Sequence, residues 1–447
     1  MRNNWLNRLL WMLIFIQGVA AIVAMRPWMT NDSVVYLELA HSLTEGRYGN
    51  HTSAGFQTDV LRPPGYPIIL WIWLYVLKLP IAALISSQVA LCLASVRLIE
   101  RFLVQREIDP TVFLLCAVAY PFTAIYGASV MGEAWATLAL TYIAVNLARP
   151  MHTQFLLVAM GAVAAGAALI RADLLLLPLL IGAVVAATRF RSGFVFATVG
   201  SLLPVLAAAL VLSPYAAWNY QKFGKAFPAP NAAAVGNSLY LATWQSKLPL
   251  RDLNSMYDGK ANDQARVSGL VGEVATINRS FGADPALAPF NPVVYPTRKQ
   301  RIDSSRAFGN AAMQRIRNDP IDYVRHVVMN VWTLWNTGEY PAGIPAIVIF
   351  VLSVVSAIMW AAGMVGASIA FVRHRFSGFG IAALVMVYPM VVHLPLHTEA
   401  RYTAAARPLL LMFAALLLST LFAWFHRPNS RHRHAHNRLR SGSGASR

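Results

Sequence analysis

The sequence predicts an all-α polytopic membrane protein with about ten transmembrane helices. Two features of its composition indicate this class: 57% of the 447 residues are hydrophobic and only 13% are charged, and the mean hydropathy is +0.50. A soluble domain carries about twice that share of charge. In addition, apolar runs of about 20 residues, the length that crosses a bilayer, recur along most of the chain. Together these observations exclude an ordinary soluble enzyme.

Ten apolar segments are predicted to cross the membrane, and the shorter ones rest on hydropathy alone. They lie near residues 9–29, 80–103, 111–129, 133–148, 155–170, 174–187, 194–215, 343–372, 379–394 and 404–425. The apolar run at 68–78 is too short to span, so we predict an interfacial or re-entrant helix there. The expected architecture is a helical bundle with juxtamembrane helices and a long loop region on its outer side.

The distribution of arginine predicts the orientation, because Lys and Arg are retained on the cytoplasmic side. Arginines precede the first span and follow the second, fourth, sixth and eighth: Arg2, Arg8, Arg97, Arg101, Arg106, Arg149, Arg189, Arg191, Arg373 and Arg375. They share one side if the N-terminus is cytoplasmic, and the C-terminus then ends on that side too. We expect a multi-pass protein of the inner (cytoplasmic) membrane. The net charge of +18 reflects this topology and contact with anionic membrane lipids, and no nucleic-acid partner is expected.

The predicted spans divide the chain into four regions. Residues 1–215 form an N-terminal transmembrane region with a first outer loop at 30–67, and residues 216–341 form a long outer loop region. Residues 342–425 hold the C-terminal transmembrane helices, and 426–447 form a basic cytoplasmic tail. An outer segment as long as 216–341 is usually functional.

The long outer loop region contains predicted helices at 302–317 and 320–335 and several aromatic residues: Trp244, Tyr257, Tyr295 and Tyr340. Aromatic faces with Arg and Asn between them suit sugars or lipid headgroups. Amphipathic helices that rest on a bilayer have the same appearance. The sequence leaves both interpretations open.

The first outer loop places a carboxylate, Asp32, at the mouth of a membrane helix, where a lone charge is costly and usually functional. From Val34 to Leu43 the apolar side chains fall mostly on one helical face, which predicts a helix along the membrane surface. The alternative interpretation is that Asp32 is only the N-cap of that helix. The chain must then turn, because the prolines of Arg62-Pro63-Pro64-Gly65-Tyr66-Pro67 lack amide donors and Gly65 permits unusual dihedral angles.

Further charged residues lie at the outer ends of other spans. Glu133 begins the fourth span, where the helix dipole alone would favour it, and Arg171 and Asp173 occupy a tight outer hairpin, where a local ion pair would explain them. His393 and His397 have the helical spacing of metal ligands, but the intervening Pro395 interrupts the helix that would align them. The same loop continues with Glu399, Arg401 and Tyr402. Each residue has an ordinary explanation alone, but these explanations do not predict that all of them converge on one membrane face.

The order of these motifs resembles the GT-C glycosyltransferases, in particular the bacterial enzymes similar to protein O-mannosyltransferases and the lipid A aminoarabinose transferase. The shared pattern is Asp32 with the Tyr36 and Leu39-Ala40 that follow it, Gly46-Arg47-Tyr48, Pro63-Pro64-Gly65-Tyr66-Pro67, Glu133, Arg171-Ala172-Asp173 and Glu399-Ala400-Arg401-Tyr402. The resemblance runs from the first span to Pro408, and is dense in the first third of the chain and around 399–408. The long outer loop and the tail add nothing specific to the family.

The resemblance implies transfer of a sugar from a polyprenyl-phosphate carrier to a lipid, glycan or protein acceptor on the outer side, with inversion at the anomeric carbon. Asp32 matches the catalytic acidic position and would be the general base. Glu133 matches the second acidic position and would orient the acceptor or hold a divalent cation. Arg171 and Arg401 would neutralise the leaving phosphate. Further expected substrate-binding residues are Arg62, Tyr66, Asp173, His397, Glu399 and Tyr402.

One departure from the family pattern bears on the cofactor. Many relatives carry two adjacent acids in the first loop, whereas this chain has Asn31-Asp32. A bound metal is therefore less expected here, and a divalent cation is the one cofactor that the family pattern suggests.

Two other function classes would also give a basic polytopic chain with polar residues at membrane depth. A transporter or flippase of lipid-linked sugars would place polar groups near span centres and break matching spans in two halves with Gly and Pro. The sequence instead gathers its polar groups at outer helix ends. A non-enzymatic scaffold would tolerate the loss of Asp32.

Overall fold

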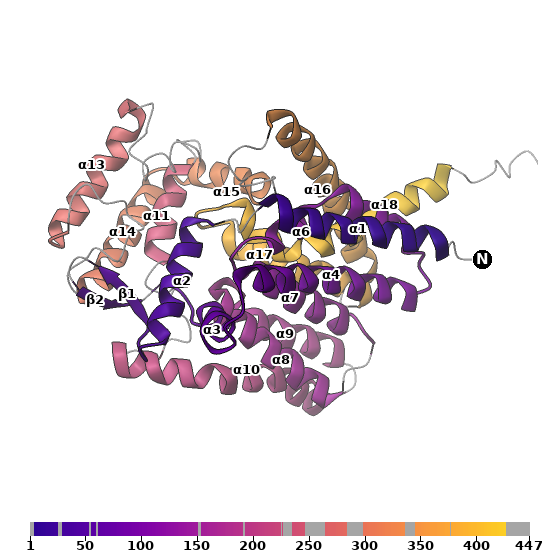
Figure 1. Cartoon of the computed structure of the whole chain (residues 1–447), viewed down its shortest axis with the longest axis horizontal. Helices are drawn as coiled ribbons and strands as arrows, with labels where there is room; N and C mark the ends of the chain where they lie inside the picture. Colours follow the sequence, from indigo (N-terminus) through magenta and orange to yellow (C-terminus); the bar gives the residue numbers. More distant parts are fainter. Residues whose placement is uncertain are drawn as a thin grey trace, which may run out of the picture.

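We describe the protein from a computed structural model of the whole chain (Figure 1). The structure describes residues 4–25, 29–52, 55–59, 61–150, 153–190, 193–224, 226, 235–245, 264–283, 298–335, 345–375 and 377–425. The basic tail and the aromatic residues Tyr257, Tyr295 and Tyr340 lie outside these residues. Within the ranges given, two short strands are the only departure from helices, turns and connecting segments, so the prediction of an all-α fold is confirmed.

The segment 30–67, which the sequence predicts as the first outer loop, folds into a small unit after the first helix. Its elements follow one another along the chain: α1 (Asn4–Met25), α2 (Asn31–Leu43), the antiparallel pair β1 (Gly49–Thr52) and β2 (Gly55–Thr58), α3 (Gly65–Trp71) and the π-helical turn η1 (Ile72–Val76). The cap of α2 is Thr30, whose hydroxyl accepts from the Ser33 amide while the Ser33 hydroxyl accepts from the Thr30 amide. The capping role that was the alternative for Asp32 therefore belongs to Thr30, and Asp32 lies in the first turn.

The first part of the bundle follows. Its elements are α4 (Ile81–Gln105), α5 (Thr111–Ala119), α6 (Phe122–Gly127), α7 (Glu133–Leu147), α8 (Gln154–Ile170), the 3-10 turn η2 (Ala172–Leu174), α9 (Leu177–Arg189) and α10 (Phe194–Phe223). The segment predicted as one span at 111–129 forms two helices, because the ring and missing amide of Pro121 interrupt the helix after Ala119. Helix α10 is longer than the predicted span and ends at Phe223, where Gly224 adopts a positive φ.

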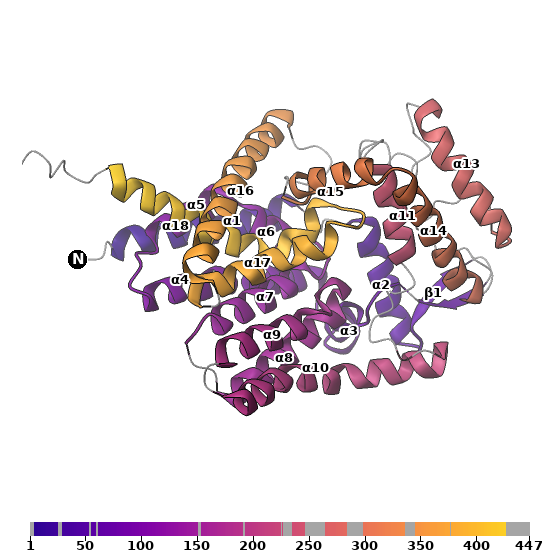
Figure 2. The ribbon, with the colours of Figure 1, turned by 180° about the vertical axis from the view of Figure 1, so that it is seen from behind.

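The remaining elements comprise the helices of the region predicted to be outer, which we call the outer helices, and the last part of the bundle. They are α11 (Val235–Gln245), α13 (Gln264–Ser280), α14 (Arg298–Asn318), α15 (Pro320–Trp335), α16 (Ala346–His374), α17 (Gly378–His393), the 3-10 helix η6 (Ala400–Ala406) and α18 (Arg407–Phe425). Figures 1 and 2 show α13, α14 and the strand pair at one end of the long axis. The start of α1 and the end of α18 lie at the other end, so the two ends of the bundle differ.

Six helices among the described residues are long and apolar enough to cross a membrane: Trp5–Ala24, Ile81–Gln105, Ala172–Arg189, Phe194–Lys222, Ala346–His374 and Ala400–Trp424. Shorter apolar helices lie at Gly65–Val76, Gln154–Ile170 and Gly378–His393. Of the other predicted spans, α7 has only 15 residues and the α5–α6 pair is broken. Each predicted span thus falls on helix, and the chain is a multi-pass membrane protein.

The core of the bundle is one large apolar cluster that joins α4, α5, α7, α8, α9, α17 and α18. Two glycines allow α3 and α7 to approach the end of α8. A Cβ on Gly65 would lie 2.5 Å from the Leu169 carbonyl oxygen, and one on Gly132 would lie 2.4 Å from Cγ2 of Ile170. Gly65 has no positive φ, so its glycine is explained by this close approach and not by the unusual dihedral angles that the sequence suggested.

The outer helices α11, α13 and α14 have a small core of their own. Tyr240, Trp244 and Phe308 are buried in it. The Arg315 guanidinium lies 3.8 Å from the centre of the Trp244 ring and forms an ion pair with Glu273, which also accepts a hydrogen bond of 2.9 Å from the Tyr240 hydroxyl. Trp244 is therefore a core residue of this unit, and its ring is not exposed as a sugar-binding platform.

Candidate active site

The residues predicted for the site are joined by contacts at the end of the bundle that carries the outer loops. They form two charged networks, which we name by their central residues. The Asp32 network consists of Asp32, Asp59, Arg62, Glu399 and Arg401. The Arg171 network consists of Glu133, Arg171, Asp173 and His393.

Both carboxylate oxygens of Asp32 are engaged by guanidinium groups. Arg62 Nη2 donates to Oδ1 at 2.7 Å, and Arg401 Nη1 lies 2.7 Å from Oδ2. Burial raises the pKa of the Asp32 carboxyl, but the positive charges of Arg401 and Arg62 outweigh this effect and hold the pKa below its ordinary value. Asp32 is therefore ionised at neutral pH.

Arg62 is fixed by its own loop. Its amide donates to Asp59 Oδ1 at 2.7 Å, and its carbonyl accepts from the Tyr48 hydroxyl at 2.9 Å. Its guanidinium lies 5.9 Å from the centre of the Tyr36 ring and 3.9 Å from Asp59 Oδ2. Asp59 was missed by the sequence analysis, although an Asp three residues before Arg62 in a proline-rich turn is typical of a side chain that caps the local backbone.

Arg401 bridges Asp32 to Glu399. Besides its contact with Asp32, its Nε lies 2.5 Å from Glu399 Oε2. Both residues lie where η6 begins, and this segment is tied to the bundle by the fully buried Arg407, whose Nη2 donates to the Ala400 carbonyl at 3.0 Å. An arginine inside an apolar span was itself a signal that the sequence analysis did not use.

The loop before η6 is held by the outer helices. The side-chain amide of Gln245 makes two hydrogen bonds of 3.1 Å with the backbone of Thr398. The backbone amide of His397 donates to the Ser238 carbonyl at 3.0 Å. The Thr398 hydroxyl donates to Asn330 Oδ1 at 2.9 Å. Helices α11 and α15 thereby set the position of the loop that supplies Glu399 and Arg401.

The Arg171 network is more saturated and more buried. Arg171 donates through Nε and Nη2 to the two oxygens of Asp173, each at 3.1 Å, and through Nη1 to Glu133 Oε1 at 3.0 Å. Asp173 Oδ2 also lies 3.2 Å from His393 Nε2. The Asp173 carbonyl accepts from the Tyr388 hydroxyl at 2.8 Å. This network joins α7, η2 and α17.

Glu133 carries an unsatisfied oxygen. Its side chain is only 4% exposed, and Oε2 has no hydrogen-bond partner among the described residues. A buried carboxylate oxygen in this state is costly unless a substrate or an ion completes it. Glu133 is therefore a good candidate for a substrate contact.

Aromatic side chains pack around the two networks. Tyr36 packs edge-on against Tyr66, with ring centres 5.1 Å apart, and the Tyr66 hydroxyl donates to Gln88 at 2.9 Å. Tyr402 stacks on His393 at 4.2 Å and contacts His397 edge-on at 6.3 Å. Burial lowers the pKa of His397, so this imidazole is mostly neutral at pH 7.

The described residues do not form a metal site. No group of three or more His, Cys, Asp or Glu side chains in this part of the chain is arranged to hold an ion. His393 lies beside Asp173 and Tyr402, and His397 Nδ1 lies 3.8 Å from Glu399. Glu133 Oε2 is a suitable single ligand without companions, so we assign no chemistry to a divalent cation.

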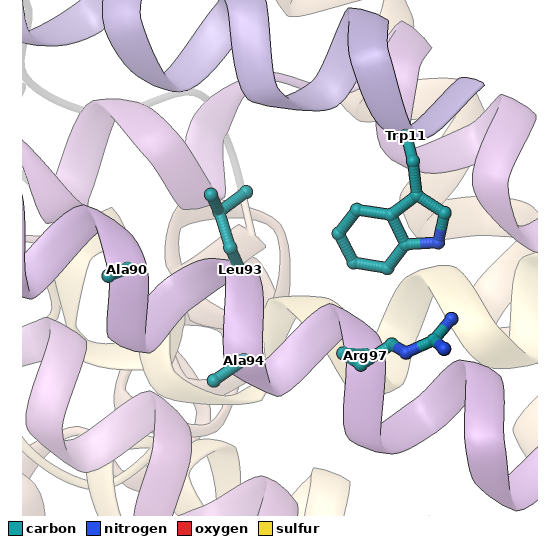
Figure 3. A pocket seen from close by; sticks show the side chains of 5 residues that line it. All are labelled: Trp11, Ala90, Leu93, Ala94 and Arg97. Atoms are coloured by element: carbon teal, nitrogen blue, oxygen red, sulfur yellow. The ribbon is translucent and has the colours of Figure 1, made fainter. Parts of the chain in front are cut away.

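A surface groove of about 400 Å³ lies between α1 and α4 (Figure 3). It is lined by Trp11, Ala90, Leu93, Ala94 and Arg97. Trp11 belongs to α1, whose start lies at the end of the molecule opposite to α13 and α14 (Figure 1). None of the predicted site residues contributes to this groove.

Comparisons with known proteins give a coarse likeness. No family model and no curated protein sequence matches the chain. One similar solved structure is the oligosaccharyltransferase AglB from Archaeoglobus fulgidus, with a TM-score of 0.47 and 13% identity over 98% of this chain and 52% of that chain. Another is ArnT from Cupriavidus metallidurans bound to undecaprenyl phosphate, with a TM-score of 0.40 and 16% identity over 91% of this chain and 76% of that chain.

This protein thus spans about half the length of AglB. Both solved proteins are GT-C glycosyltransferases, the family that the sequence resembles. At these TM-scores and identities the likeness concerns the general arrangement of helices, and it carries nothing about activity or substrate.

Proposed function

We propose that the protein is a membrane glycosyltransferase that moves a sugar from a polyprenyl-phosphate donor to a lipid, glycan or protein acceptor on the outer face of the inner membrane. The observation that carries this proposal is the ionised Asp32 carboxylate, held between Arg62 and Arg401 at the outer-loop end of a multi-pass bundle. An enzyme of this kind needs a base for the acceptor hydroxyl beside cations for the leaving phosphate. The order of the GT-C motifs along the chain supports the same interpretation.

In the proposed reaction, Asp32 accepts the proton of the acceptor hydroxyl as that oxygen attacks the anomeric carbon. The bond from the anomeric carbon to the phosphate oxygen breaks, and its electron pair stays on the polyprenyl phosphate. Attack from the face opposite to the leaving group inverts the anomeric centre. Glu133, with its unsatisfied Oε2, orients the acceptor.

Two arginines have different roles in this proposal. Arg401 contacts the donor phosphate directly, because it belongs to the Asp32 network, which is more exposed than the Arg171 network. Arg171 is also expected near the phosphate from the family pattern, but three of its nitrogens already face Asp173 and Glu133. We assign Arg171 to holding Glu133 in place. Its positive charge then lies behind Glu133 and does not contact the substrate directly.

The test is a reconstituted assay with polyprenyl-phosphate sugars and candidate acceptors on the outer-loop side of the protein. We expect product from the parent protein and a loss of about 10²–10⁴ in rate for Asp32→Asn, the usual cost of removing a general base. The matched control is Asp109→Asn, which changes an exposed Asp at the start of α5 away from the site. Donor crossing the bilayer without product would establish a flippase instead, and equal rates for Asp32→Asn and the parent would refute the base assignment.

The proposed sidedness has a separate test with two cysteine variants. Ser280 on α13 and Ser377 before α17 are both exposed, and each hydroxyl donates to the carbonyl three residues earlier. Both native cysteines are buried and should give little background. In intact cells, an impermeant thiol reagent should label Ser280→Cys and not Ser377→Cys. Labelling of Ser377→Cys alone would reverse the topology.

A further inference from the structure

We infer that the phosphate of the donor unmasks the catalytic carboxylate: it draws the Arg401 guanidinium away from Asp32, so that Asp32 acts as a base only when donor is bound. This inference rests on the proposed glycosyl transfer. It adds to that proposal an order of events, with donor before acceptor.

The first support is that Asp32 is masked in the structure. Each of its oxygens has a charged nitrogen at 2.7 Å. A carboxylate that holds two charged donors is stabilised as the anion and is a weak proton acceptor. The low pKa of Asp32 agrees with this geometry. While both guanidinium groups contact Asp32, this carboxylate is a poor base for an acceptor hydroxyl.

The second support is that the two guanidinium groups are held differently. The Arg62 backbone is pinned on both sides, by Asp59 at its amide and by Tyr48 at its carbonyl. Arg401 keeps a short contact with a second carboxylate when it leaves Asp32, because its Nε lies 2.5 Å from Glu399 Oε2, whereas the second carboxylate of Arg62, Asp59, is 3.9 Å away. Rotation about that contact lets Nη1 leave Asp32 while the side chain stays anchored. Arg401 is therefore the mobile member of the pair and Glu399 its pivot.

The third support is the chemistry of the incoming group. A phosphate offers a guanidinium a forked, charge-assisted contact, whereas Asp32 offers Arg401 one oxygen. The donor phosphodiester carries one negative charge, and bond cleavage adds a second to the departing phosphate. Arg401 is therefore held more strongly as the acceptor proton moves to Asp32. When the polyprenyl phosphate leaves, Arg401 returns and the proton passes from Asp32 to water.

The test is the affinity of the purified protein in nanodiscs for undecaprenyl phosphate at pH 7, measured by tryptophan fluorescence. If Asp32 competes with phosphate for Arg401, Asp32→Asn should bind undecaprenyl phosphate about tenfold more tightly than the parent, the scale of one charge-assisted hydrogen bond. The double variant Asp32→Asn/Arg401→Gln should lose this gain. Size-exclusion chromatography verifies that each variant is folded.

A matched control separates competition for Arg401 from the simple removal of a negative charge. Asp59→Asn removes one charge from the same network beside Arg62, and its amide oxygen can still accept from the loop backbone. We expect Asp59→Asn to bind undecaprenyl phosphate with nearly the parent affinity. An equal gain for Asp59→Asn and Asp32→Asn, or no gain for Asp32→Asn, would overturn the inference. If the parent transfers sugar in either of these cases, the proposed function stands without it; if the parent transfers none, the proposed function fails first.

Discussion

Arg401 and Arg171 both lie between two carboxylates at the same end of the bundle, but they bind them differently. Arg401 gives one nitrogen to Asp32 and one to Glu399, whereas Arg171 gives a two-nitrogen fork to Asp173 and a third nitrogen to Glu133. The side chains of Asp32 and Arg401 are 26% and 16% exposed, and those of Arg171 and Asp173 are 11% and 10% exposed. Single contacts near solvent can be exchanged for a ligand, while a buried fork fixes its helices.

The largest expected effect is on stability, and it separates the two arginines. Arg171→Leu leaves Asp173 and Glu133 as buried carboxylates without their cation, which costs about 3–5 kcal/mol. Arg401→Leu leaves Asp32 paired with Arg62 but removes the cation beside Glu399, and in this less buried network it should cost about 1–3 kcal/mol. Thermal unfolding of the detergent-solubilised variants measures the difference. If Arg401→Leu lowered the midpoint as much as Arg171→Leu, the contrast between an exchangeable network and a structural one would be lost.

A smaller effect is expected where α3 rests on the helix that leads to Arg171. Gly65→Ala places a methyl group against the Leu169 carbonyl, and overpacking of this kind costs about 1–3 kcal/mol. A Cβ on Gly166, in the same α8, would have no heavy atom of another part of the chain within 4 Å, so Gly166→Ala should be neutral or stabilising by up to about 1 kcal/mol. The two variants are compared by thermal unfolding. Equal midpoints for Gly65→Ala and the parent would show that α3 yields freely and does not brace the Arg171 network.

The smallest effect is a pH dependence. The depressed pKa of Asp32 gives stability that is present above its ordinary value of 3.8 and is lost only as the pH falls below it. Burial lowers the pKa of His326, which lies beside Asn330, from 6.5 to about 4. As the pH falls, His326 is therefore protonated in the unfolded chain before it is protonated in the folded protein. Stability should therefore decline as the pH falls below 6.5 because of His326 and His397, whose pKa values are both lowered by burial, and not because of Asp32.

The measurement is the unfolding midpoint between about pH 7 and pH 4.5, a range that covers the titration of His326 in the unfolded chain. His326→Gln keeps an acceptor for Asn330 and should make the profile shallower, with the remaining slope due to His397, whereas Asp32→Asn should leave the slope unchanged. A profile flattened by Asp32→Asn would mean that the Asp32 network is weaker than its two short contacts indicate.

The fold was largely predictable, because bilayer thickness dictates the length and polarity of spanning segments. The predicted helices at 302–317 and 320–335 correspond to α14 and α15. The break at Pro121 was readable from the residue itself, but the segment was apolar throughout and was taken as one span. The role of Gly65 was not readable, since a close approach to Leu169 depends on tertiary packing.

The candidate site was predictable as a set of residues and not as a set of pairs. Asp32 and Arg401 stand far apart in the chain, and nothing in their local sequence indicates that they touch. The same holds for Glu133 and Arg171, whose contact requires α7 and α8 to be packed. Asp59 and Arg407 were missed because one has a local capping role and the other acts through the Ala400 carbonyl.

Helices α11 and α15 fix the position of the loop at Thr398, and this determines when the site is completed during synthesis of the chain. Arg401 belongs to the last part of the chain, and its loop is positioned by Gln245 and Asn330, which are made long before it. A ribosome must therefore deliver the final membrane segment before Asp32 meets its second arginine. A chain interrupted before residue 401 would lack Arg401, and under the proposed mechanism it would therefore lack the group that binds the donor phosphate.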